Sequence, residues 1–127
     1  MNAAFVDTSL LAAILLDEPG GRPAATRLAR FDRLFAATLL EAEIRSLLSR
    51  ERVGAPPDLA LSAFSWVIPD RRLTAEYGRV LTHGNVRGAD LHHLATALFL
   101  DPEASELAFL TLDSRQRAVA RQLGFST

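Results

Sequence analysis

The sequence contains no cysteine and no lysine, because all 14 of its basic residues are arginine. The missing cysteine excludes disulfide scaffolds, cysteine nucleophiles and thiolate metal sites. The missing lysine excludes Schiff-base chemistry and a phosphate-binding loop with Gly-Lys-Ser/Thr. It also disfavours a receiver-type phospho-acceptor domain, which uses a lysine beside its acidic pocket. Covalent catalysis by either side chain is therefore ruled out.

Excess charge and long apolar runs are also lacking. The formal net charge of −1 argues against a broad surface that coats nucleic acid, but it permits local arginine clusters. The longest apolar run, residues 10–16, is too short to span a bilayer. No basic segment precedes the first apolar residues, so we expect no signal peptide, no membrane contact and a cytoplasmic protein.

The remaining composition is that of a globular domain, with 127 residues of which 49% are hydrophobic and 23% charged. The length predicts one domain over residues 1–127. Strand-like and helix-like segments alternate, and no tight two-residue hairpin joins two strands. This alternation predicts an α/β fold with a central, mostly parallel sheet of about four to five short strands, flanked by helices on both faces.

Hydrophobic periodicity and capping residues give the expected elements. The predicted strands cover 3–6, 33–37 and 107–112, with a short extended segment at 67–69 and another from residue 125. The predicted helices cover 10–16, 23–30, 38–52, 58–66, 73–81, 88–100 and 114–123. Thr38 and Glu41 match a capping box, in which the two side chains satisfy the first backbone N–H groups of a helix.

Acidic residues mark the carboxyl ends of the predicted strands, where parallel sheets bind ligands. Asp7 and Asp113 each follow a strand, Asp90 begins a helix, and Glu43 lies one turn into another. Each aspartate alone is explained as a helix cap, and Glu43 alone as a solvated helix residue. Four converging carboxylates would repel one another unless a divalent cation neutralised them, and oxygen ligands favour Mg²⁺ or Mn²⁺.

Glu41 competes with Glu43 for this site. The two side chains point about 200° apart on a helix, so one of them at most can join the other acids. Periodicity does not choose between them, because both flank the apolar stripe. The capping box gives Glu41 a structural role and leaves Glu43 for the site.

Hydroxyl, imidazole and guanidinium groups accompany the acids. Thr8, Ser9 and Thr111 can cap helices or donate hydrogen bonds to a carboxylate, a water or a substrate. The adjacent His92 and His93 point to different sides of a helix, so we expect His93 to pack or hydrogen-bond rather than to bind zinc.

The arginines form three local groups, which are either solvated helix faces or contacts to a phosphate backbone. The groups are Arg22, Arg27, Arg30 and Arg33; Arg45, Arg50 and Arg52; and Arg115, Arg117 and Arg121. Arg87 and Arg115 are nearest in sequence to predicted acids. They are the best candidates for substrate contact, unless they pair with a carboxylate of the site.

Four segments in this order and spacing resemble the PIN domain, and more narrowly the VapC-type toxins of bacterial toxin–antitoxin pairs. They are FVDTS at 5–9, LEAEI at 40–44, DLHHLATA at 90–97 and LTLD at 110–113. The resemblance covers the whole chain and implies a single PIN-like nuclease domain. It implies a metal-dependent endoribonuclease in which one or two Mg²⁺ or Mn²⁺ ions activate the water that attacks the phosphodiester. The implied catalytic and metal-binding residues are Asp7, Glu43, Asp90 and Asp113.

The resemblance also implies partners, namely an RNA substrate, a cognate antitoxin protein and a second copy of the chain in a homodimer. Apolar residues sufficient for both a core and a groove are present at 10–16, Phe31, Leu34, Leu59, Leu61, Phe64 and Trp66. Two alternatives stay open. One is a non-catalytic PIN-like module that binds RNA or protein. The other is an aspartate-nucleophile phosphatase, which is weakened because Ser9 stands where a second aspartate is needed.

Overall fold

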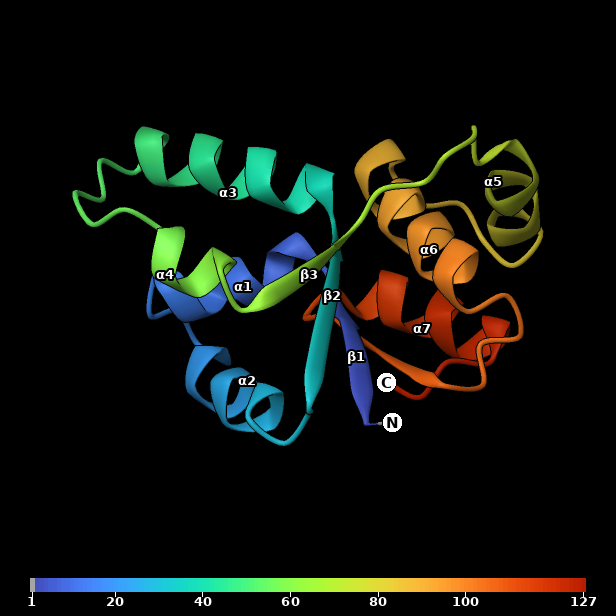
Figure 1. Cartoon of the computed structure of the whole chain (residues 1–127), viewed down its shortest axis with the longest axis horizontal. Coiled ribbons are helices and arrows are strands. Elements are labelled where there is room, and N and C mark those ends of the chain that lie inside the picture. The colour runs from blue at the N-terminus through green and yellow to red at the C-terminus, as the bar shows by residue number, and fades with distance from the viewer. Residues whose placement is uncertain (1) are drawn as a thin grey trace.

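The computed structural model describes residues 2–127 and contains one four-stranded sheet in which every pairing is parallel. The strands are β1 (Ala3–Val6), β2 (Arg33–Ala37), β3 (Phe64–Val67) and β4 (Leu107–Leu110), in the order β3-β2-β1-β4. In the middle of the sheet, Phe5 of β1 lies between Phe35 of β2 and Phe109 of β4. Because all strands run the same way, their carboxyl ends lie at one edge, at the top of Figure 1.

Helices cover both faces of the sheet (Figure 1). They are α1 (Thr8–Leu15), α2 (Gly21–Leu28), α3 (Thr38–Arg50), α4 (Asp58–Leu61), α5 (Thr74–Leu81), α6 (Gly88–Leu100) and α7 (Ser114–Leu123). The first four pack on one face and the last three on the other, which makes a three-layer α/β/α domain. No helix within residues 2–127 is long and apolar enough to cross a membrane.

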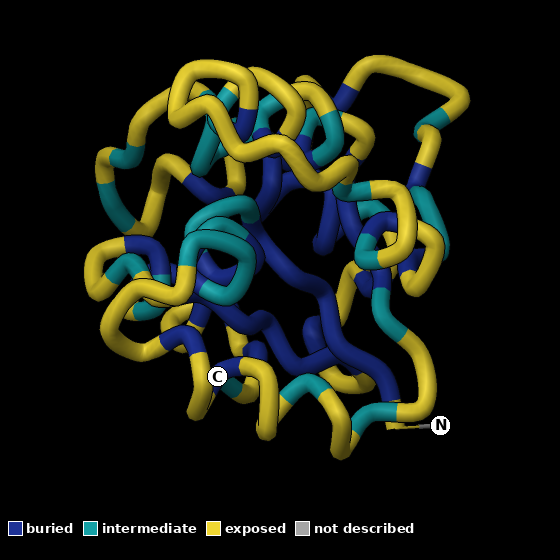
Figure 2. Tube along the Cα trace, turned by 90° about the vertical axis from the view of Figure 1, so that its left-hand side faces the viewer, coloured by how far each residue is buried: buried dark blue, intermediate teal, exposed yellow. Residues whose placement is uncertain are grey.

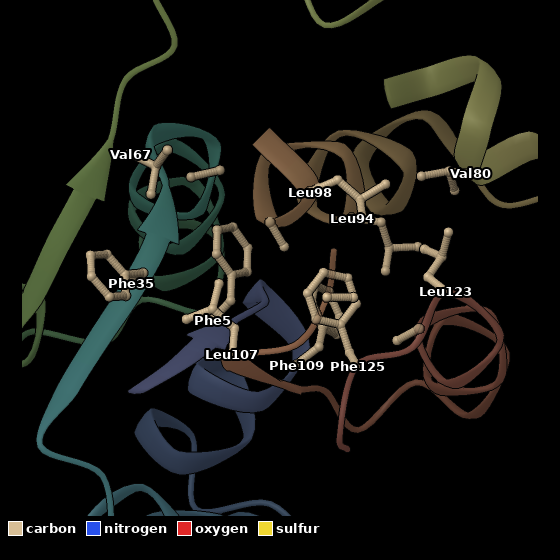
Figure 3. Packing of buried hydrophobic residues seen from close by; sticks show 14 of the residues in the cluster. Phe5, Phe35, Val67, Val80, Leu94, Leu98, Leu107, Phe109, Leu123 and Phe125 are labelled. Carbon is tan, nitrogen blue, oxygen red and sulfur yellow. The ribbon is translucent and has the colours of Figure 1, made fainter. Parts of the chain in front are cut away.

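Alternation along the strands builds a separate core on each face. Ala4 and Val6 of β1 face α1 and α3, whereas Ala3 and Phe5 face α6 and α7. On the second face Phe5 stacks on Phe109 with ring centroids 5.7 Å apart (Figure 3). The buried strands run through the centre of the molecule and the exposed residues follow its outside (Figure 2). The predicted α/β class with a parallel sheet is confirmed.

Two local predictions are wrong. A helix was expected over 58–66, but α4 ends at Leu61 and Phe64–Val67 form β3, because pairing with β2 satisfies their backbone. The capping box at the start of α3 does not form, since Ala37 occupies the N-cap and no side chain caps it. Glu41 instead accepts a hydrogen bond from Arg45, one turn along the helix, at 2.8 Å.

Candidate active site

The carboxyl end of β1 places Asp7 at the centre of the sheet edge. The side chain is 1% exposed and caps α1 by accepting a hydrogen bond from the Leu10 N–H at 3.2 Å. It also accepts from the hydroxyl of Ser9 at 2.9 Å and that of Thr111 at 2.6 Å. Burial raises the pKa of Asp7 above its usual range, although the hydrogen bonds from Thr111 and Ser9 oppose this rise.

Glu43 reaches the site from the first half of α3. Its Oε1 accepts a hydrogen bond from the Thr8 hydroxyl at 2.6 Å and lies 3.0 Å from Nε2 of His93, which comes from α6. The hydrogen bond from His93 lowers the pKa of Glu43, and the one from Thr8 adds to this effect. The interpretation of His93 as a buried, hydrogen-bonding residue is confirmed, as it is 1% exposed. Glu43 is thus fixed on the side facing α6, away from Glu41.

Asp90 and Asp113 lie together in a hollow of about 380 Å³. The hollow is lined by Asn85, Val86, Arg87, Asp90, Asp113 and Arg115. Burial raises the pKa of Asp90, and the negative charges of Asp113 and, to a smaller extent, Glu43 raise it further. Asp90 is therefore close enough to both Asp113 and Glu43 to be repelled by their charges.

The two aspartates are held differently. Asp113 caps α7 by accepting from the Gln116 N–H at 2.8 Å, as predicted. Asp90 does not cap its helix, because Arg87 occupies the N-cap of α6 and Asp90 lies in the first turn. Its carboxylate is consequently left facing the hollow.

Arg87 and Arg115 bring positive charge to the same hollow. Arg87 lowers the pKa of Asp90 slightly, which indicates that the two groups are near each other. Within residues 2–127 neither arginine makes an ion pair with a carboxylate. Both guanidinium groups therefore remain available for an anionic ligand.

A family model described as PIN domain matches residues 4–122. The chain belongs to the PIN-domain family. No curated protein sequence and no solved structure matches it. PIN domains are generally nucleases, so the fold is of a nuclease type.

PIN-domain nucleases typically use divalent metals, which raises the question of whether this acidic edge fits one. Across the described chain, no group of three or more histidine, aspartate or glutamate side chains is placed to hold a metal ion directly. Asp90 and Asp113 do suit a hydrated cation, because both residues line the same hollow and the charge of Asp113 raises the pKa of Asp90. Mg²⁺ usually retains several waters and binds only one or two carboxylates.

Gln116 is a residue of this PIN domain that sequence analysis did not single out. It is fully buried, and its Nε2 donates to the backbone carbonyl of Asp90 at 3.2 Å. Its Oε1 lies 3.2 Å from the hydroxyl of Thr111, which itself holds Asp7. One side chain thus connects the segments that carry Asp7, Asp90 and Asp113. The contact to Asp90 joins segments that are 26 positions apart, so no local sequence pattern indicates it.

Proposed function

We propose that the protein is a metal-dependent endoribonuclease that acts as the toxin of a type II toxin–antitoxin pair. The observation that carries the proposal is the hollow in which Asp90 and Asp113 lie beside Arg87 and Arg115. Carboxylates suited to Mg²⁺ or Mn²⁺ and guanidinium groups suited to phosphate are the two requirements of phosphodiester hydrolysis.

Each residue has a role in this proposal. Asp90 and Asp113 would hold the cation, and Glu43 and Asp7 would complete the acidic set through water, since no three of these side chains in the described chain are placed to bind a metal directly. When bound, the cation supplies a nucleophilic water at neutral pH and neutralises charge on the phosphate. Arg87 and Arg115 would orient the phosphate.

Hydrogen bonds that already exist would keep two of these acids in place. Thr8 and His93 hold Glu43, and Ser9 and Thr111 hold Asp7. Fixed orientation of acidic groups reduces the reorganisation needed during the reaction. Thr8 and Thr111 are proposed to assist substrate binding through this positioning.

The proposed partners are a cognate antitoxin and a second copy of the chain. Leu59, one of the apolar residues expected for a core or a groove, is 87% exposed and therefore accessible to a protein partner. The other predicted apolar residues of this region contribute mainly to the core, with Leu61 and Phe64 buried. We also propose that the protein works in the cytoplasm, where RNA is available.

Cleavage of total RNA by the purified protein tests the proposal. We expect cleavage with Mg²⁺ or Mn²⁺, none with EDTA, and none with Asp7→Asn, which keeps the shape of the side chain but removes its charge. Asp32→Asn is the matched control, because Asp32 is exposed and precedes β2, at the edge of the sheet opposite the acids. Metal-independent cleavage, or full activity of Asp7→Asn, would exclude the mechanism. An intact acidic set with no turnover would indicate a non-catalytic PIN-like binding module.

The toxin role needs its own readout in bacterial cells. Expression of the wild-type chain should slow growth, whereas Asp7→Asn should not. Normal growth together with RNA cleavage in vitro would separate the nuclease activity from the toxin role.

A further inference from the structure

A second hollow, of about 420 Å³, adjoins the acidic edge on the side of α1 and α3. It is lined by Thr8, Ala42, Glu43, Ser46, Leu47 and Arg50. Thr8 and Glu43 also belong to the candidate active site, so this hollow begins at the Glu43 carboxylate. The other four residues have no role in the function proposed above.

The residues that continue from Glu43 share one face of α3. Ser46, Leu47 and Arg50 follow Glu43 by three, four and seven positions, which places all of them on the same side of a helix. At 1.5 Å per residue, Arg50 lies roughly 10 Å along the helix from Glu43. α3 leads away from the sheet edge, on the opposite side of the sheet from α6 (Figure 1). The acids are therefore flanked by Arg87 and Arg115 on one side and by Arg50 on the other.

Arg50 is free to bind an anion. Its side chain is 71% exposed, and its ion pair with Glu51 is long, with 3.7 Å between Nε of Arg50 and Oε1 of Glu51. Arg45 on the same helix differs, because Glu41 and Asp58 each hold its guanidinium at 2.8 Å. A guanidinium group bound this weakly by its neighbours can engage a phosphate in two parallel hydrogen bonds.

The other residues of the hollow suit the sugar and the base of a nucleotide. Ser46 is exposed and offers a hydroxyl for a ribose or phosphate oxygen, and the exposed Ala42 and half-buried Leu47 offer apolar surface for the face of a base. The volume lies within the range of sites for small ligands. A single-stranded segment can place one unstacked nucleotide in such a hollow, whereas the bases of a duplex are stacked and paired.

We propose that this hollow is a substrate subsite that binds the nucleotide next to the scissile phosphate of single-stranded RNA. Arg50 holds a phosphate, Ser46 contacts the sugar–phosphate backbone, and Leu47 packs against the base. The strand then crosses the acids and continues toward Arg87 and Arg115. This inference rests on the proposed nuclease function, because it treats the acids as the point of cleavage.

Binding of a fluorescein-labelled single-stranded RNA decamer, measured in EDTA by anisotropy, tests the subsite without cleavage. We expect Arg50→Ala to raise the Kd about tenfold at low salt and to reduce the slope of log Kd against log salt by about 0.7, the value for one lost contact on a single strand. Arg50→Lys should recover part of the affinity, since it keeps the charge. Arg27→Ala is the matched control, because Arg27 is an exposed arginine on α2, outside both hollows.

The same variants are then compared during cleavage with Mg²⁺ or Mn²⁺. Arg50→Ala should raise KM by the factor seen in Kd and leave kcat within about twofold, because it removes binding that substrate and transition state share. Melting temperatures of all variants establish that they are folded.

The outcomes separate the subsite from the nuclease function. If the wild type cleaves RNA but Arg50→Ala binds and cleaves as Arg27→Ala does, the subsite is wrong and the nuclease function stands. If binding depends on Arg50 but no metal supports cleavage, the nuclease function fails. Equal affinity for a duplex of the same sequence, or no RNA binding by the wild type, overturns the subsite.

Discussion

At the scale of single residues, the four carboxylates at one sheet edge have three kinds of surroundings. Asp7 is buried and hydrogen-bonded on both oxygens. Glu43 is held by an imidazole and a hydroxyl. Asp90 and Asp113 face an open hollow. These surroundings move the pKa in opposite directions, upward for Asp7 and Asp90 and downward for Glu43. Such differences between neighbouring acids are typical of catalytic sites.

The buried charge of Asp7 should cost stability in the metal-free protein. Because folding raises the pKa of Asp7, the folded state binds its proton more tightly than the unfolded state. The cost of burying the Asp7 charge is complete at a pH above the raised pKa, and it is relieved as the pH falls through that pKa. We expect Asp7→Asn to increase the free energy of unfolding at pH 7 by about 0.5–2 kcal/mol, and the gain to shrink in acid. Urea denaturation of both proteins at several pH values measures this difference in the free energy of unfolding.

Asp32→Asn serves as the control for the Asp7 experiment. Asp32 is exposed, so its substitution should change the free energy of unfolding by less than about 0.5 kcal/mol at every pH. A loss of stability in Asp7→Asn at pH 7 would mean that its hydrogen bonds outweigh the cost of burying its charge.

The sequence carries different amounts of information about where each of these acids lies. Asp7 and Asp113 follow strands, and parallel strands necessarily bring their carboxyl ends to one edge. The sequence prefers Glu43 over Glu41 for the site because of a capping box, but Thr38 forms no cap, Arg45 holds Glu41, and Glu43 contacts His93 of α6. The choice depends on how α3 is rotated against α6, which is a property of packing and not of helix periodicity.

At the scale of elements, the main error concerns β3. The helix expected over 58–66 ends at Leu61, and the next residues pair with β2, about thirty positions earlier in the chain. Phe64, Trp66 and Val67 favour strands, but four residues are too short a segment for a clear local signal, so the distant pairing with β2 decides their conformation. The longer α3 and α6 were predicted nearly to their ends, because 13 residues of apolar periodicity make a strong local signal.

The packing of α2 against α1 depends on a glycine. A Cβ atom on Gly21 would lie 2.4 Å from the backbone oxygen of Ala13, and backbone cannot rotate away as a side chain can. We expect Gly21→Ala to lower the free energy of unfolding by about 1–3 kcal/mol through overpacking. Chemical denaturation of the purified variants measures this change.

Gly78 provides the opposite case for comparison. It lies inside α5, and nothing stands within 4 Å of its added Cβ. Gly78→Ala should therefore stabilise the protein by about 0.5–1 kcal/mol, because alanine loses less conformational entropy in a helix. Equal effects of the two substitutions would refute the close packing of α1 and α2.

At the scale of the whole molecule, the fold gathers like charges from β1, α3, α6 and α7 at one edge of its sheet. The repulsion is visible in Asp90, whose pKa is raised by burial and then by Asp113 and Glu43. The 14 arginines and 15 acids nearly cancel overall, so the formal charge of −1 conceals this local separation. A cation that neutralises the edge should therefore favour the folded state over the unfolded state.

Thermal melting in Mg²⁺ or Mn²⁺ tests that coupling. At a concentration of ten times its Kd, a cation that binds only the folded state adds about 1.4 kcal/mol to the free energy of unfolding. This raises the Tm of a domain this size by roughly 4–7 °C. The rise should vanish with EDTA and be much smaller in Asp90→Asn, whereas Asp32→Asn should retain it. Protons compete with the cation for Asp90, and the pKa of Asp90 is raised. As the pH is lowered, the increase in Tm should therefore weaken at a higher pH than it would for an aspartate of ordinary pKa. An unchanged Tm in the wild type, or an equal rise in Asp90→Asn, would show that the cation does not bind at this edge.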